Sequence, residues 1–440
     1  MANKFDLKSA EKYLSKKCDA YEMCYSESAD ESISFENNKL SSIENRSGAG
    51  AGFRIIKNKK IGFSFTTNPE KIKEAAGYAL ESSKFGEKAG FVFPKKSMPL
   101  HDVKMSDQKV KDFDLKSLIP LGNKIIKKIS SKIKDAVVSI GFDKGEAEGV
   151  FLNSSGVFYA EDTTDFSCGV SINVTHPKAG LISLYESKSR ANLYPIEDIE
   201  KMAEIIIQKY SASIKPAVIK AGNYPVIFNK YSIGFLFSCI LEAVNGKIFQ
   251  KGISPLSDKL GKKILDSRIS IYDDPAIDYL GGSYIFDGEG LPAYKKPLIE
   301  EGVFKNFIFD LRTASLVKAK PTANAGRSFS SQPAPSFGNI VISAGDTPYK
   351  DMIKNLDEGI IIEQVIGAGQ SNTLAGDVSV NVDMGYLVKN GKIKGRVKDC
   401  MIAANVYDIF KNIQSISSDL FVKSSMITPA ICFNKINVAV

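Results

Sequence analysis

The chain has 440 residues, of which 43% are hydrophobic and 25% are charged, a composition typical of a globular protein with two or three domains. Its formal charge of +8 is spread along the chain in short lysine pairs such as Lys59–Lys60 and Lys262–Lys263. Because these pairs form no dense stripe and do not alternate with aromatic residues, the charge argues against a nucleic-acid partner.

Six cysteines are scattered without a CxxC pair, and most have apolar neighbours, which indicates reduced thiols in a cytosolic protein. The N-terminal segment lacks the apolar core of a secretory signal. The longest apolar stretch, residues 233–244, is shorter than the roughly 20 residues that a membrane helix needs. We therefore expect a cytoplasmic protein without a membrane span.

Residues 1–85 predict an α+β domain. Asp6 is placed to cap a first helix, in which apolar residues recur at helical spacing from Leu7 to Leu14. Strand signals follow at residues 21–25, 32–35, 53–56 and 61–65, with a Gly-rich turn at 48–52 and a hairpin turn at 58–60. Asn68 and Pro69 then open a second helix, with proline at the favoured first position.

Residues 86–112, rich in Lys, Gly and Pro, predict a linker. Residues 113–220 predict a second α+β domain. Its helices are expected at about 120–134 and 196–210, and its strands at 150–152, 157–160 and 166–174. Because helix, strands and helix occur in this order twice, the pattern is consistent with an internal duplication, although no residue-level repeat is visible.

Residues 221–440 predict a β-rich domain of the sandwich or barrel type. A strand at 225–228 and a helix at 233–244 are followed by many short strands between turns such as Lys389–Lys392. The sequence as a whole therefore predicts the α+β class, with a helix-plus-sheet region followed by a β-rich C-terminal domain.

The residues offer no self-contained catalytic site. A zinc hydrolase needs three protein ligands and an open position for water, but the only histidines are His101, in the expected linker, and His176, which precedes a proline. Neither has a His or Cys four residues away. A GxSxG elbow and a P-loop are absent, and the SxxK match at Ser9–Lys12 lies on the first amphipathic helix. We therefore assign no catalytic and no metal-binding residue.

The chain resembles the TldD/PmbA family, whose members include so-called modulators of DNA gyrase. The resemblance rests on the joint order of short motifs over nearly the whole chain. In the first half they are Gly52–Ile56 and Gly62–Thr67; in the second half they are Phe286–Gly290, Leu298–Val303, Asp310–Ala314, Lys320–Arg327, Gly367–Asn372, Gly376–Asp377, Tyr386–Ile393 and Thr428–Ile431.

The resemblance also implies a branch of the family. The TldD branch is described as a metallopeptidase with His-Glu-x-x-x-His on a helix and a Cys near the C-terminus. In the matching helix, Phe237 and Glu242 stand at the His positions and Ser238 at the Glu position. A gapped match of Leu241–Val244 to the family's HEAV string places Leu241 and Gly246 as ligands, and neither can bind metal. The Cys-bearing loop is also missing. The chain therefore resembles the PmbA branch, also called TldE.

The resemblance implies a non-catalytic subunit of a zinc peptidase heterodimer that acts on small, unfolded or modified peptides. A TldD-type partner would supply the zinc, so no cofactor is expected in this chain. The alternative is a homodimer that binds peptides without cleaving them; a gyrase regulator has no support beyond the mild positive charge. Polar turns predict a peptide or partner surface, with candidate residues Asn324, Arg327, Ser331, Gly367, Gly369, Gln370 and Asn372.

Overall fold

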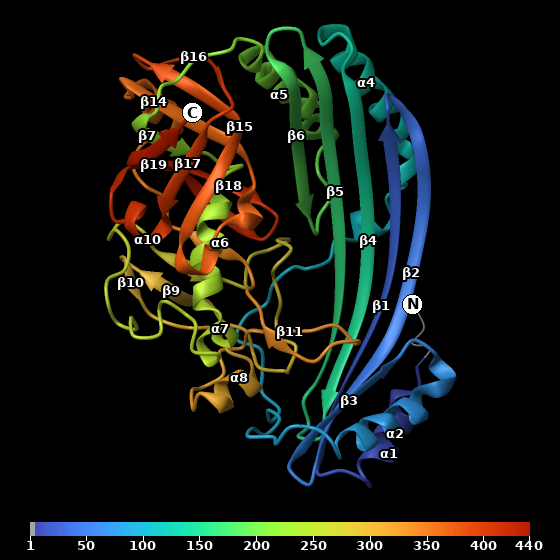
Figure 1. The fold of residues 1–440 in the computed structure, drawn as a ribbon. Helices are drawn as coiled ribbons and strands as arrows, with labels where there is room; N and C mark the ends of the chain where they lie inside the picture. Colours follow the sequence, from blue (N-terminus) through green and yellow to red (C-terminus); the bar gives the residue numbers. More distant parts are fainter. Residues whose placement is uncertain (1–4) are drawn as a thin grey trace.

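The computed structural model describes residues 5–440, apart from the side chain of Gln370. Its first half is built on a six-stranded antiparallel sheet in the order β3-β2-β1-β4-β5-β6. The strands are β1 Ala20–Glu36, β2 Lys39–Lys57, β3 Lys60–Thr66, β4 Val137–Asn153, β5 Phe158–His176 and β6 Gly180–Arg190. Figure 1 shows this sheet as a tall, curved wall beside the C-terminal domain.

The helix cap and the hairpin turn predicted in the first segment are confirmed. Asp6 accepts a hydrogen bond from the Ser9 N–H at 3.0 Å and caps α1 (Leu7–Leu14). Asn58 and Lys59 have φ values of 51° and 61° and form the β2–β3 turn. Two other predictions were wrong. The strands predicted at 21–25 and 32–35 are parts of the single strand β1, which has 17 residues, and the turn predicted at 48–52 lies inside β2, where its glycines pair with β1.

The two faces of the sheet differ in chemistry because side chains alternate along each strand. Apolar residues such as Met23, Ile33 and Phe35 face a helical layer. That layer contains α1, η1 Pro69–Lys71, α2 Ile72–Ser82, α3 Gln108–Lys111, η2 Leu115–Leu118, α4 Ile119–Lys132 and α5 Ile196–Ser213. The opposite face presents mainly Ser, Gly and Asp, for example Ser26, Asp30 and Gly145.

The predicted segments 1–85 and 113–220 each supply three strands to this one sheet, and they join through the antiparallel pairing of β1 with β4. Each segment has the order helix, three strands, helix, as the sequence pattern indicated. The intervening segment 86–112 is not free of the core, since Phe93 and Val103 are both buried.

The C-terminal domain contains a closed five-stranded barrel, which confirms the predicted α+β class with a barrel-like domain. The barrel closes in the order β7-β14-β15-β17-β19 and back to β7. Its strands are β7 Gly222–Phe228, β14 Glu358–Ile366, β15 Asp377–Lys389, β17 Met401–Asn405 and β19 Met426–Ala439.

Further short elements extend the barrel sheet or pack on it. The strands are β8 Ile271–Asp273, β9 Lys296–Glu300, β10 Val303–Phe304, β13 Ile340–Ile342, β16 Lys392–Val397 and β18 Ile413–Lys423, with the separate pair β11 Ala325–Gly326 and β12 Ala334–Pro335. The helices are α6 Ile233–Val244, α7 Gly246–Gln250, α8 Leu311–Leu316, α9 Tyr349–Lys354, η3 Ala368–Gln370, η4 Thr373–Ala375 and α10 Val406–Ile409.

Helix α6 belongs to the core of the C-terminal domain. Phe237 on this helix is fully buried, and its ring centroid lies 5.0 Å from that of Phe410. Phe410 in turn packs against Phe433 of β19 at 5.1 Å. Within residues 5–440, no helix is long and apolar enough to cross a membrane.

We expect Phe237→Ala to destabilise the C-terminal domain by about 3–5 kcal/mol, because it removes a buried ring and leaves a cavity. Denaturant unfolding would measure the loss. The matched control is Phe85→Ala, at a side chain that is 91% exposed, with an expected change within about 0.5 kcal/mol. Equal effects of the two substitutions would contradict the placement of α6 in the core.

Candidate functional site

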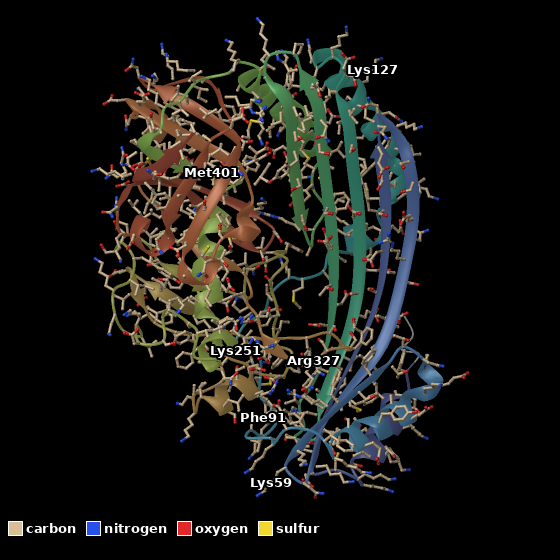
Figure 2. All side chains as sticks on the ribbon, viewed as in Figure 1. Lys59, Phe91, Lys127, Lys251, Arg327 and Met401 are labelled. Carbon is tan, nitrogen blue, oxygen red and sulfur yellow. The ribbon has the colours of Figure 1, made fainter. Side chains whose placement is uncertain are left out.

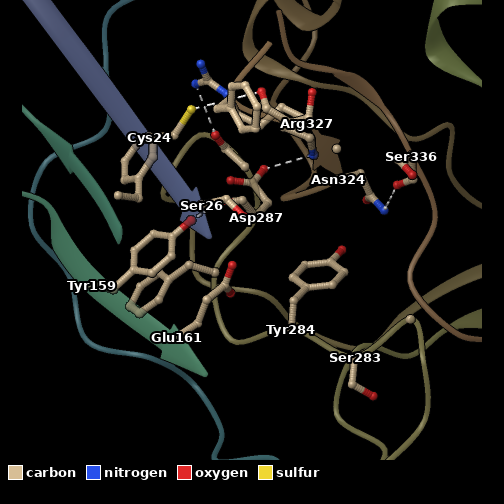
Figure 3. Close-up of a pocket in the computed structure, with 18 of the residues that line it drawn as sticks. Cys24, Ser26, Tyr159, Glu161, Ser283, Tyr284, Asp287, Asn324, Arg327 and Ser336 are labelled. Carbon is tan, nitrogen blue, oxygen red and sulfur yellow. Dashed lines mark hydrogen bonds between the residues drawn. The ribbon is translucent and has the colours of Figure 1, made fainter. Parts of the chain in front are cut away.

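A cavity of about 490 Å³ lies between the polar face of the sheet and loops of the C-terminal domain. The sheet contributes residues such as Cys24, Ser26 and Glu161, and the C-terminal loops contribute residues such as Tyr284 and Asp287 (Figure 3). Both sides belong to one chain. The cavity is therefore present without a second subunit.

One wall of the cavity is a stack of three aromatic rings. Tyr159 stacks on Phe151 at 5.2 Å and on Phe286 at 4.9 Å between ring centroids. Its hydroxyl donates a hydrogen bond to the Asp287 carbonyl at 3.0 Å. Burial raises the pKa of Tyr159, so the phenol stays protonated at neutral pH and serves as a hydrogen-bond donor.

A buried charge network joins the sheet to the C-terminal domain beside this cavity. Arg54 of β2 is 1% exposed. Its Nε lies 2.8 Å from Glu22 Oε1, and its Nη2 lies 2.7 Å from Glu289 Oε1. Burial lowers the pKa of Arg54, but the carboxylates of Glu22 and Glu289 outweigh this effect and raise the pKa overall. Burial also raises the pKa of Glu289, against the effect of Arg54.

The residues of the Phe286–Gly290 motif organise the loops around the network. The Asp287 carboxylate accepts hydrogen bonds from the backbone N–H groups of Glu289, Leu291 and Ala325 at 2.9–3.1 Å. Glu289 Oε2 accepts one from the Leu311 N–H at 2.7 Å. Residues of three separate motifs, Phe286–Gly290, Asp310–Ala314 and Lys320–Arg327, therefore meet here.

Asn324 and Arg327 both line the cavity, and both have partners inside the protein. Asn324 Nδ2 donates to Asp273 Oδ2 at 2.5 Å and to the Ser336 carbonyl at 2.9 Å. Arg327 Nη1 forms an ion pair with Glu22, which also binds Arg54. Figure 2 shows Arg327 between the sheet and the C-terminal domain.

Ser331 is exposed, and its hydroxyl accepts a hydrogen bond from the Ser328 N–H at 3.0 Å. It does not line the cavity. The segment that carries the first three candidate residues thus runs from the cavity to the surface.

The other candidate residues lie in a separate loop, outside the cavity lining. Gly367 has a φ of 87°, which favours glycine, and a Cβ on Gly369 would meet open space. Asn372 accepts a hydrogen bond from the Ala375 N–H at 3.4 Å. Gln370 ends η3, and its side chain lies outside the described part of the structure.

This loop packs against α6, the helix at which the family resemblance would place zinc ligands. The Thr373 hydroxyl donates a hydrogen bond to Glu242 Oε2 at 2.9 Å. Glu242 is one of the three helix positions that the resemblance compares with His-Glu-x-x-x-His. At the other two, Phe237 lies in the core, and the hydroxyl of the exposed Ser238 donates a hydrogen bond to the Phe235 carbonyl. These side chains do not fit a zinc ion, because only Glu242 could be a ligand. Across residues 5–440, we find no group of three or more His, Cys, Asp or Glu side chains placed to hold a metal ion.

The comparisons with known proteins agree with these motifs. The model of the PmbA/TldA metallopeptidase C-terminal domain matches residues 221–440, and that of domain 1 matches residues 21–83. The chain belongs to the PmbA/TldD metallopeptidase family. An uncharacterized protein of Methanocaldococcus jannaschii is 29% identical over 94% of both chains. A metalloprotease of Methanothermobacter thermautotrophicus is 27% identical over 88% of this chain and 86% of its own.

Solved structures of this family share the fold. The crystal structure of TldE from Thermococcus kodakarensis is similar with a TM-score of 0.89 and 28% identity, over 98% of both chains. A structure from Thermotoga maritima, with a TM-score of 0.86 and 21% identity over 96% of both chains, supports the fold alone.

Sequence analysis missed the sheet side of the cavity, namely Cys24, Ser26, Tyr159 and Glu161. The sequence of β1 nevertheless contains a signal for this polar face. From Cys24 to Ser34, every second residue of β1 is Cys, Ser or Asp, whereas the residues between them include Tyr25, Ile33 and other larger side chains. Such alternation indicates one polar and one covered face, although it does not identify what the polar face meets.

We expect Arg54→Met to cost about 3–5 kcal/mol of stability, because it leaves buried carboxylates without their shared cation. A carboxyl whose folded-state pKa is raised stabilises the fold at low pH and loses that contribution as the pH rises. Loss of Arg54 would raise the pKa of Glu289 further, so the variant should lose more stability at pH 8 than at pH 5.

Urea unfolding at both pH values would measure this difference. Arg312→Met is the control, since Arg312 forms an exposed ion pair with Glu87 and should contribute no more than about 1 kcal/mol. A loss for Arg54→Met that is as small as the control and independent of pH would contradict the role of the network.

Proposed function

We propose that this chain is a TldE-type subunit that pairs with a TldD-type metallopeptidase in the cytoplasm and helps it to degrade or mature small unfolded peptides. The observation that carries the proposal is the chemistry of α6. Phe237 occupies a ligand position as part of the core, and Glu242 is held by Thr373. The partner would supply the zinc, its ligands and the general base.

The contribution of this chain would be a wall of the space that holds the peptide. Besides the cavity described above, a second cavity of about 700 Å³ lies between the polar face near Asp143 and the β18–β19 turn near Lys423. The polar face carries small side chains, which leave room for an extended backbone. Hydroxyl and main-chain groups can hold such a backbone with little preference for its sequence.

The alternative function is a homodimer that captures peptides without cleaving them. One observation favours it: the 490 Å³ cavity is formed between two parts of this chain, the polar face of the sheet and the loops of the C-terminal domain. Such a protein would bind peptide in the absence of any TldD-type chain.

The first experiment is to co-purify this chain with a TldD-type protein from the same cell. Zinc content and cleavage of an unstructured peptide would be measured for each chain alone and for the mixture. We expect cleavage only by the mixture and all zinc with the partner. Stoichiometric zinc or cleavage in this chain alone would contradict the proposal, and tight peptide binding by this chain alone would favour the homodimer.

We also expect Ser26→Phe to reduce peptide cleavage by the mixture roughly tenfold, or about 1.4 kcal/mol, because the ring would fill the cavity. Ser28→Phe is the matched control, since Ser28 lies on the same face of β1 but does not line the cavity. Co-purification should be unchanged in both variants. Equal rates for the two variants would show that the cavity does not hold the peptide.

A further inference from the structure

One carboxylate in the cavity of about 490 Å³ has no partner among the described residues. Glu161 of β5 lines this cavity, and Figure 3 shows its side chain directed into it beside Tyr159. Within residues 5–440, we find no hydrogen bond or ion pair to the Glu161 carboxylate. The Asp287 carboxylate, which also lines the cavity, instead accepts hydrogen bonds from three backbone N–H groups. Glu161 is therefore the carboxylate that a ligand can bind.

A glycine on the neighbouring strand determines where this carboxylate lies. Glu161 pairs with Gly149 of β4, and Gly149 pairs with Ser26 of β1. A Cβ on Gly149 would lie 2.9 Å from Glu161 Oε1 and 3.0 Å from its Cγ. The Glu161 side chain therefore lies across β4, over the glycine, in the direction of Ser26. Because Ser26 lines the same cavity, its hydroxyl and the carboxylate can meet one ligand.

The charges around Glu161 favour a cationic ligand. Among the described residues that line the cavity, the only cation is Arg327, which already forms an ion pair with Glu22. The other guanidinium nitrogens of Arg327, Nε and Nη2, are buried away from solvent. The cavity walls displace water from Glu161, which raises the pKa of its carboxyl, and a cation beside it would have the opposite effect. A positively charged ligand would therefore stabilise the carboxylate.

The aromatic residues of the cavity also favour positive charge. The three stacked rings described above and the ring of Tyr284 lie in the same lining as Glu161. The hydroxyls of Tyr159 and Tyr284 donate hydrogen bonds to the carbonyls of Asp287 and Ala323 at 3.0 Å and 2.9 Å. Toward the cavity these oxygens can therefore only accept. Aromatic rings and acceptor oxygens both attract ammonium and guanidinium groups.

We propose that this cavity binds the positively charged group of a peptide, either its N-terminal ammonium or a Lys or Arg side chain, with Glu161 as the counter-ion. The inference rests on the proposed function, since it takes unfolded peptides as the ligands, and it adds a preference for cationic ones. A volume of about 490 Å³ suits one long side chain or the end of a peptide. The rest of the peptide would extend along the polar face.

Three unstructured peptides that share one neutral sequence test the proposal. The first is capped at both ends, the second has a free N-terminus, and the third is capped and carries one Lys. Fluorescence anisotropy would measure their binding to the full chain. We expect at least one charged peptide to bind at least roughly tenfold more tightly than the capped neutral one, and the second and third peptides distinguish the source of the cation. Equal affinity of all three, or no binding of any, would overturn the proposal.

Three variants locate the preference. Glu161→Gln removes the charge with little change in shape and should abolish the preference for charged peptides. Asp165→Asn is the matched control, since Asp165 lies on the same face of β5 but does not line the cavity, and it should keep the preference. Gly149→Ala keeps the charge but displaces the carboxylate, so it should reduce the preference. Thermal unfolding would confirm that each variant folds.

A preference that survives Glu161→Gln, or one that Asp165→Asn reduces equally, would overturn the proposal. Cleavage of the same peptides by the mixture with a TldD-type chain tests the proposed function separately. If the mixture cleaves them and binding shows no charge preference, only the cation site is wrong. If binding shows the preference and the mixture cleaves none of them, only the proposed peptidase role is contradicted.

Discussion

The arrangement of the two halves depends on one buried cation. Arg54 binds Glu22 within the sheet and Glu289 of the C-terminal domain, and its guanidinium carbon lies 5.2 Å and 5.3 Å from the ring centroids of Phe91 and Phe93. It therefore touches the sheet, the connecting segment and the C-terminal domain at once. Buried ion pairs add little net stability, but leaving one partner alone is costly. Arg54 thus selects one relative placement of these three parts.

This placement gives the family motifs their roles. Glu289 reaches Arg54 from the tight turn of the Phe286–Gly290 loop, in which Gly290 has a φ of 85°. The same loop holds the backbone of Ala325 through Asp287. Gly52 lies against the Phe329 carbonyl, where a Cβ would clash at 2.0 Å. The motifs Gly52–Ile56, Phe286–Gly290 and Lys320–Arg327 therefore meet where the sheet joins the C-terminal domain, beside the cavity.

Local features could be predicted from the sequence because their causes are local. The Asp6 cap, the Asn58–Lys59 turn and the alternation in β1 each depend on neighbouring residues. The pairing of β1 with β4 joins residues more than 100 positions apart, so the single sheet could not be inferred from such patterns. The same holds for the cavity. Asn324 and Arg327, which line the cavity, could be proposed from the sequence because they lie in a polar turn, whereas Ser26 and Tyr159 required the strand pairing to be known.

The composition of α6 explains why its side chains at Phe237, Ser238 and Glu242 do not form a metal site. A catalytic zinc needs polar ligands beside a water-filled position, whereas a helix at the centre of a domain needs apolar side chains. Phe237 is such an apolar side chain and packs on Phe410. The exposed Glu242 accepts a hydrogen bond from the Thr373 hydroxyl. Restoring ligands here would remove a buried ring from the core. On α6, the side chains thus serve core packing. The open polar surface lies instead on the long sheet, and this is the surface that we propose holds the peptide.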